Sequence, residues 1–195
     1  FTAPETAMVC SPDGFGQMRR QYHKAIRKHL LRDPYQYERK PVLVNNWEAT
    51  YFDFDADKLV DIAREAADLG IELFVMDDGW FGSRNDDNSG LGDWQVNREK
   101  LPGGLEALVP CVKDLGMKFG IWMEPEMVNE DSDLYRAHPD WILRVPGRAP
   151  SRGRGQLVLD FSRKDVRDHI YDQMKAVLGS ADISYIKWDM NRSLT

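Results

Sequence analysis

The sequence predicts an α/β fold, the N-terminal half of a (β/α)8 (TIM) barrel with about four βα units. Short apolar runs alternate with stretches of helical period, which is typical of a parallel sheet covered by helices. The tripeptide Asp-Leu-Gly recurs at 68–70 and 114–116, each time between a helical stripe and an apolar run that ends in carboxylates. A complete barrel needs about 250 residues, whereas this chain has 195. An open doubly wound sheet also fits the alternation, but its glycine-rich phosphate loop is missing after the first strand.

Composition narrows the class of protein. Hydrophobic residues make up 42% and charged residues 30%, as in a soluble globular protein, and the net charge of -6 argues against nucleic-acid and membrane partners. Only two cysteines, Cys10 and Cys111, are present, which is no disulfide framework and favours a reducing, cytoplasmic compartment. Because the first residue is Phe1, we expect the chain to begin inside a longer protein or to have been processed.

Residues 1–40 form a lead-in and a connecting helix. Two prolines and a Pro-Asp-Gly turn predict irregular structure over 1–13. Apolar residues recur every four positions over 14–31, which predicts a helix with a basic, solvated outer side. Asp33-Pro34 ends it.

From residue 41 onward we expect the first half of the barrel, truncated at the C-terminus. β-branched and aromatic residues predict four strands, at 42–48, 71–77, 118–124 and 183–189, and a possible extra strand at 157–160.

Three helices are predicted between these strands. Asp57 can cap the first, which Gly70 closes. The second carries an apolar stripe over 105–115, on which Cys111 falls as a core residue. Ser162 and Asp165 form the pattern of a capping box before the third.

Every predicted strand ends in polar or acidic residues, and in a barrel these ends meet around one mouth. Those residues are Asn46, Glu48, Asp77, Asp78, Glu124, Glu126, Lys187 and Asp189. Four tryptophans accompany them: Trp47, Trp80, Trp122 and Trp188. Carboxylates that accept hydroxyl hydrogen bonds, walled by aromatic rings, suit a sugar.

The last strand offers the candidate catalytic group. Side chains alternate along a strand, so Lys187 and Asp189 share one face while Ile186, Trp188 and Met190 form an apolar one. Asp189 is the candidate carboxylate, and Lys187 beside it would keep it ionised. The alternative is a structural ion pair at a strand end.

Two other uses of the charged residues stay open. Asp77 and Asp78 could bind a divalent metal, although Lys187 already supplies a cation and no histidine lies beside a strand end. The loop that starts at Asp86 departs from a calcium-binding pattern at its sixth and twelfth positions. Four arginines over 144–154 could bind phosphate or RNA, or simply be solvated.

Six strings in order carry a resemblance to a known family. They are NNWEA at 45–49, DDGWFG at 77–82, GDW at 92–94, WMEPEM at 122–127, QLVLD at 156–160 and KWDMN at 187–191. The chain thereby resembles the catalytic domain of family 36 glycoside hydrolases, the larger microbial α-galactosidases.

The resemblance implies an N-terminal β-sandwich before Phe1, from which residues 1–40 lead into the barrel, and further barrel and β domains past Thr195. By the same resemblance Asp189 is the nucleophile, and the acid/base residue lies downstream. The substrate-binding residues that it implies are Trp47, Asp77, Asp78, Trp122, Arg154, Lys187 and Asn191. The family usually has Asn after the arginine, where this chain has Gly155.

The expected activity is therefore that of a retaining α-galactosidase, which hydrolyses terminal α-galactosyl residues of oligosaccharides through a covalent galactosyl-Asp intermediate. No cofactor or metal is expected. The expected partners are a galactoside substrate and, in the full-length protein, further copies of the chain. A galactosyltransferase similar to raffinose synthase, a galactoside-binding module and a divalent-metal hydrolase are the alternatives. We expect the segment alone to be inactive, with Glu124 and Glu126 on another side of the mouth.

Overall fold

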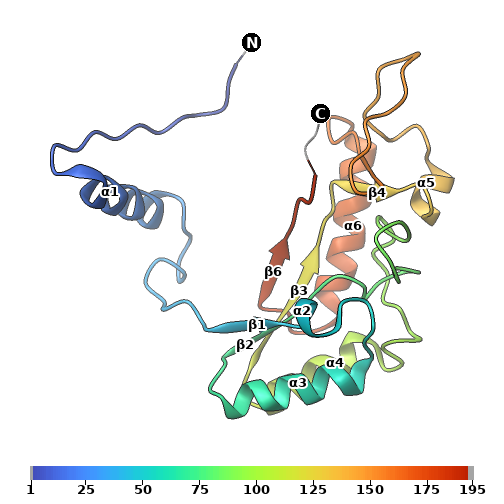
Figure 1. Ribbon diagram of the computed structural model, residues 1–195, viewed down its shortest axis with the longest axis horizontal. Helices are drawn as coiled ribbons and strands as arrows, with labels where there is room; N and C mark the ends of the chain where they lie inside the picture. The colour runs from blue at the N-terminus through green and yellow to red at the C-terminus, as the bar shows by residue number, and fades with distance from the viewer. Residues whose placement is uncertain (1, 193–195) are drawn as a thin grey trace. The chain divides into compact units, whose positions relative to one another are not determined.

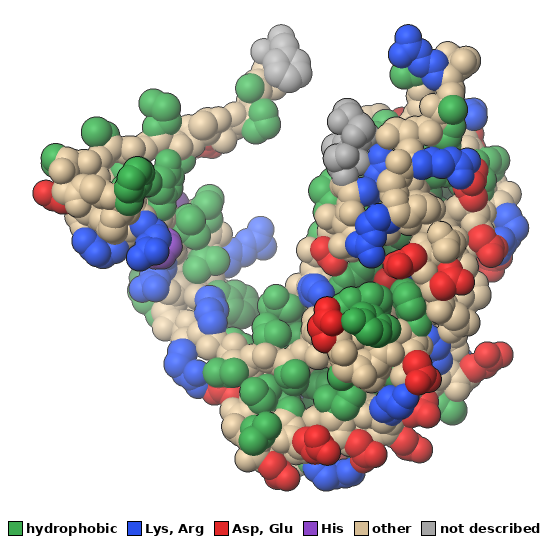
Figure 2. All heavy atoms as spheres, viewed as in Figure 1, with side chains coloured by type: hydrophobic (Ala, Val, Ile, Leu, Met, Phe, Trp, Pro, Cys, Tyr) green, Lys and Arg blue, Asp and Glu red, His purple; other side chains and the backbone are tan. Residues whose placement is uncertain are grey.

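The computed structural model describes residues 2–192, and contacts along the chain divide it into two units, with the boundary between Lys40 and Pro41. The first unit contains the helix α1 (Gly14–His29), as predicted, and residues 2–10 before it are irregular. This helix, labelled in Figure 1, buries none of its side chains, so apolar and basic residues both show on its surface in Figure 2.

The second unit is built on a four-stranded parallel sheet. The strands are β1 (Leu43–Asn45), β2 (Leu73–Met76), β3 (Lys118–Met123) and β6 (Tyr185–Trp188), and they lie side by side in that order. Each pairs in parallel with the next (Figure 1). Sequential strand order without reversal is that of a barrel, which confirms the predicted fold class.

Three helices connect these strands: α3 (Ala56–Asp68), α4 (Gly104–Asp114) and α6 (Lys164–Ser180). Parallel crossovers are right-handed, so successive helices in this strand order fall on one face of the sheet. Leu59 and Ala63 of α3, Leu108 of α4 and Val166 and Ile170 of α6 are buried there. The opposite side of α3 is rich in acidic side chains, at the lower edge of Figure 2.

Two predicted caps are wrong. Asp55, not Asp57, caps α3, because its backbone is extended and its side chain accepts a hydrogen bond from the Lys58 amide (2.9 Å). No capping box forms before α6. Ser162 donates to Asp160 instead, and Asp165 binds the Arg163 guanidinium.

The first strand is shorter than predicted. It ends at Asn45, and the short helix α2 (Trp47–Thr50) follows, so Glu48 belongs to a helix. The possible extra strand exists as β5 (Gln156–Val158). It pairs antiparallel with β4 (Met127–Asn129) in a separate small sheet, beside the short helix α5 (Asp133–Ala137).

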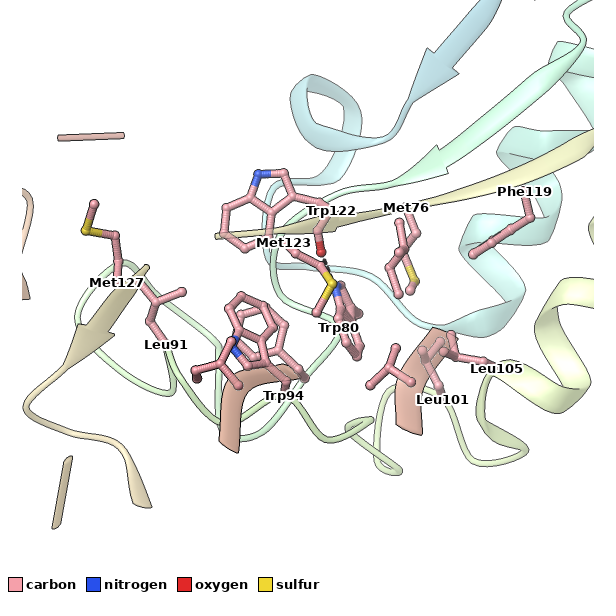
Figure 3. Close-up of a cluster of buried hydrophobic side chains, with 14 of the residues drawn as sticks. Met76, Trp80, Leu91, Trp94, Leu101, Leu105, Phe119, Trp122, Met123 and Met127 are labelled. Carbon is pink, nitrogen blue, oxygen red and sulfur yellow. Dashed lines mark hydrogen bonds between the residues drawn. The ribbon is translucent and has the colours of Figure 1, made fainter. Parts of the chain in front are cut away.

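An aromatic cluster anchors the long loop after β2. Trp80 and Trp94 come from this loop and pack with Trp122 of β3, all almost fully buried (Figure 3). The Trp80 indole N–H donates to the Trp122 carbonyl (2.9 Å), the dashed line in Figure 3. Trp80 is therefore a core residue rather than a wall of the mouth. Cys111, predicted as core, is exposed, because the buried stripe of α4 uses its neighbours Val109 and Val112.

Within residues 2–192, every helix is too short or too polar to cross a membrane.

Candidate active site

Side chains from the carboxyl ends of three strands meet at Asp77. Its Oδ2 accepts hydrogen bonds from Nδ2 of Asn45 (2.6 Å), the last residue of β1, and from Nζ of Lys187 (2.8 Å), in β6. Its Oδ1 accepts from the Asp78 amide (2.9 Å), and its own amide donates to Asn46 Oδ1 (2.8 Å). Asp77 is 2% exposed, so a single buried carboxylate joins the ends of three strands.

Asp78 is held by a different cation. Arg84, from the loop after β2, donates to both carboxylate oxygens of Asp78, with Nη2 at 2.8 Å from Oδ2 and Nε at 3.0 Å from Oδ1. Burial raises the pKa of Asp78, while Arg84 opposes that rise. Both side chains are almost fully buried, so this is a desolvated, forked ion pair.

Further contacts fix Arg84 in turn. Its Nη1 donates to the Ser89 carbonyl (3.0 Å) and to Asn129 Oδ1 (3.1 Å). Lys100 donates to the carbonyl oxygens of Arg84 and Gly79, and burial lowers the pKa of Lys100. The orientation of Asp78 is thus set by a network that spans the whole loop. Neither cation could be predicted from the strand pattern, because neither Arg84 nor Lys100 directly follows a strand.

Asp189 lies after β6 and accepts three hydrogen bonds from neutral groups. The donors are Trp122 Nε1 (3.0 Å) and Asn191 Nδ2 (3.0 Å) to Oδ2, and the Met190 amide (2.9 Å) to Oδ1. Burial raises the pKa of Asp189, but these donors and the charge of Lys187 outweigh it, so the pKa lies below the ordinary value. The carboxylate is therefore ionised and oriented.

The expected partnership of Lys187 with Asp189 is only partly correct. Lys187 lowers the pKa of Asp189 through its charge, but its hydrogen bond goes to Asp77 on a different strand. The apolar face predicted for β6 is largely exposed in this chain: Trp188 is 53% and Met190 50% exposed. Trp188 donates its indole N–H to Glu126.

Glu124 occupies a place that the sequence analysis did not foresee. Its fully buried carboxylate accepts from Asn191, whose side chain also contacts Asp189. Glu124 is thus on the same side of the mouth as the candidate nucleophile, contrary to the expectation. Burial raises its pKa, against the hydrogen bonds from Asn191 and Gln156.

The two remaining predicted site residues are Trp47 and Arg154. Trp47 is half-buried at the start of α2, with Tyr51 and Phe52 packed edge-on against its ring at 5.2 and 5.1 Å between centroids. Arg154 is not among the clustered side chains. It approaches Asp87 (3.5 Å), which in turn lies 3.8 Å from Arg84.

Arg154 and Gly155 both have positive φ, 52° and 70°, in a tight two-residue turn. The amide and carbonyl of Gly153 exchange hydrogen bonds with those of Gln156 across it. Gly and Asn are the residues that adopt this backbone most readily, so the departure at Gly155 keeps the turn. A Cβ at this position would lie 2.6 Å from Asn88 Oδ1, so the glycine also makes room for that side chain.

The arrangement disfavours a metal at the paired aspartates, because side-chain cations already neutralise them: Lys187 binds Asp77 and Arg84 binds Asp78. Over residues 2–192, no three His, Cys, Asp or Glu side chains gather as a metal site requires. What the site presents is an ionised carboxylate beside two fixed carboxylates, which suits a polyhydroxylated substrate.

Comparisons of sequence and structure show which known proteins this chain resembles. Residues 1–195 match the Melibiase family. The chain is 59% identical over 194 residues to the bifunctional alpha-galactosidase/sucrose kinase AgaSK of Mediterraneibacter gnavus, covering 100% of this chain and 21% of that protein. It is 56% identical to alpha-galactosidase AgaA of Geobacillus stearothermophilus, covering 100% of this chain and 27% of that one.

A crystal structure of AgaA superimposes with a TM-score of 0.88 at 58% identity, covering 91% of this chain and 25% of that chain. An AgaA variant in complex with raffinose gives a TM-score of 0.88 at 57% identity, with the same shares covered. The chain therefore spans between 21% and 27% of the length of these relatives.

Proposed function

This chain belongs to the melibiase family of family 36 glycoside hydrolases, and from that premise we propose that it is the first half of the catalytic barrel of a retaining α-galactosidase. The observation that carries the proposal is the Asp189 carboxylate, which is ionised and held by three N–H donors just after the end of β6. In this proposal residues 1–40 lead in from a preceding domain, and residues 41–195 are the barrel segment.

Asp189 acts as the nucleophile. Its carboxylate oxygen attacks the anomeric carbon of a terminal α-galactosyl unit while a second carboxyl group, from a part of the protein outside this chain, protonates the leaving oxygen. Water then releases galactose from the galactosyl-Asp intermediate. A pKa below the ordinary range supports this role, because a nucleophilic carboxylate has to be ionised at the working pH.

Asp77 and Asp78 bind galactose hydroxyls. A carboxylate can accept about four hydrogen bonds. Asp77 already accepts three, from Asn45, Lys187 and the Asp78 amide, so it has room for about one hydroxyl. Lys187, which binds Asp77, is placed to donate to the sugar. The Nδ2 hydrogens of Asn191 go to Glu124 and Asp189, so its side chain can contact the sugar only by accepting a hydroxyl hydrogen bond at Oδ1. Trp47 is the candidate apolar wall, whereas the almost fully buried Trp122 acts through its indole N–H to Asp189. Arg154 reaches the substrate only if its loop moves or if the substrate is extended.

Glu124 is a poor candidate for the acid. Its side chain is fully buried, and its two oxygens face N–H donors of this chain rather than an open mouth. This supports an acid from elsewhere in the protein.

The substrates proposed are raffinose-type oligosaccharides, since an AgaA variant was solved with raffinose. The test is to incubate the full-length protein with raffinose, with and without a sugar acceptor, and to separate the products. Free galactose under both conditions supports hydrolysis. Oligosaccharide products at the expense of galactose would assign the protein as a transferase, and no bond cleavage would leave only a binding module.

We further propose that the full-length protein is a cytoplasmic homo-oligomer. The two cysteines are free and exposed, as fits a reducing compartment. Light scattering of the full-length protein in solution measures its mass, and a monomeric mass would contradict the oligomer.

A further inference from the structure

Glu124 is the most deeply buried carboxylate near the site, and the proposed mechanism does not use it. Three donors face it. Its Oε1 accepts from the Asn191 amide (2.6 Å), and its Oε2 accepts from Asn191 Nδ2 (3.2 Å) and Gln156 Nε2 (3.1 Å). All three donors are neutral amides. Burying a carboxylate without a cation costs free energy. We therefore expect Glu124 to hold another side chain in a functional position.

What it fixes is Asn191. The Nδ2 atom of Asn191 donates both to Glu124 Oε2 and to Asp189 Oδ2, at 3.2 and 3.0 Å. A planar amide nitrogen carries two hydrogens, so one Nδ2 can serve two carboxylates. With Glu124 in place the nitrogen faces Asp189. Without it the amide can rotate and present its oxygen, which would repel the carboxylate.

We propose that Glu124 is a positioning residue, whose buried carboxylate orients Asn191 and, through the Asn191 amide, the Asp189 carboxylate. The inference rests on the proposed role of Asp189 as nucleophile. The Asn191 backbone amide, held by Glu124 Oε1, also fixes the chain two residues beyond Asp189. Trp122 holds the same Oδ2 from the other strand, so loss of Glu124 loosens one of two supports.

The consequence is kinetic. Glu124→Gln keeps the volume but turns one oxygen into an N–H donor that faces other donors. A displaced nucleophile loses rate on the order of 100-fold. This loss should fall on kcat, with KM changed less than about threefold, because Asp77 and Asp78 still hold the sugar.

A double-mutant cycle on the full-length protein tests the route of the effect. Glu124→Gln, Asn191→Ala and the double variant are assayed with a nitrophenyl α-galactoside. If Glu124 acts through the Asn191 side chain, its substitution costs about 100-fold in the parent and at most about 10-fold in the Asn191→Ala background. Some loss persists there because the backbone contact remains. Equal losses in both backgrounds would overturn the proposal.

The matched control is Glu126→Gln, two residues along, whose carboxylate contacts Trp188 and not Asn191. It should keep kcat within about twofold. A loss as large as that of Glu124→Gln would also overturn the proposal. If Glu124→Gln fails to fold, Glu124→Asp replaces it in the same cycle, since it keeps the charge but withdraws the oxygens from Asn191. An inactive parent protein would count against the proposed function instead.

Discussion

Lys187 Nζ lies 2.8 Å from Asp77 Oδ2, although β3 separates their strands in the sheet. The side chain of Lys187 therefore crosses the carboxyl end of β3 and connects Asp77, one of the two proposed sugar-binding aspartates, to the strand that leads into Asp189. Its charge also lowers the pKa of Asp189. One cation thus serves both halves of the proposed site.

Replacing Lys187 should affect both Asp77 and Asp189, the two parts of the proposed site that this cation serves. Lys187→Met removes the cation from an almost buried Asp77 while leaving the lysine stem volume. Since the Lys187 side chain is 36% exposed, we expect a loss of only about 1–2 kcal/mol of stability. Thermal melting and kcat/KM of the full-length protein measure the two effects. An unchanged kcat/KM would contradict the placement of Lys187 in the site.

The Asp78→Ala and Asp77→Ala variants should differ in their free energy of unfolding. Asp78→Ala leaves the buried Arg84 guanidinium without its carboxylate, which costs about 3–5 kcal/mol. Asp77→Ala leaves the more exposed Lys187, which can reach water, so its cost should be smaller. Urea denaturation of the two variants compares them. An Asp78→Ala variant that is more stable than the Asp77→Ala variant would contradict the buried ion pair of Asp78 with Arg84.

Asp78→Asn tests the recognition of galactose more sharply than Asp78→Ala, because asparagine keeps the shape of the aspartate side chain. Each hydrogen bond between a sugar hydroxyl and the charged carboxylate is worth roughly 1.5–3 kcal/mol, and the substitution weakens it. The ratio of activities on α-galactoside and α-glucoside measures the effect. An unchanged ratio in Asp77→Asn and Asp78→Asn would remove both residues from sugar recognition.

The pH dependence of kcat/KM follows from Asp189. The pKa of Asp189 lies below the ordinary 3.8, so the proposed nucleophile stays ionised until the pH falls below that value. We expect the activity that depends on it to persist over the same range. The stability from its hydrogen bonds is present above pH 3.8 and is lost as the pH falls through the lowered pKa. Trp122→Phe removes one donor and should move the acid limb of the profile to higher pH. A limb that stays in place would contradict the hydrogen bond.

The strand ends could be predicted from the sequence because apolar runs that stop at carboxylates are a local pattern. This pattern predicts Asp77, Asp78 and Asp189 as site residues, whereas Trp122 is predicted by the family resemblance. The partners were not predictable, because Arg84 and Lys100 come from a loop whose path depends on the burial of Trp80 and Trp94.

Local ambiguity explains the remaining errors. Asp55 and Asp57 both suit a helix start, and the extended backbone at Asp55 decides between them. Cys111 lies at the border of the apolar stripe of α4, where a rotation of one residue separates buried from exposed. The contact of Glu124 with Asn191 joins β3 to the loop after β6, and no spacing in the sequence reveals it.

The most direct test of the account is to trap the intermediate. The full-length protein is treated with an α-galactosyl substrate that forms the glycosyl-enzyme quickly and releases it slowly, then digested and analysed by peptide mass spectrometry. The account predicts one galactosyl adduct, on the peptide that contains Asp189, and none in Asp189→Ala. An adduct on a different carboxylate, or steady turnover by Asp189→Ala without added azide, would contradict it.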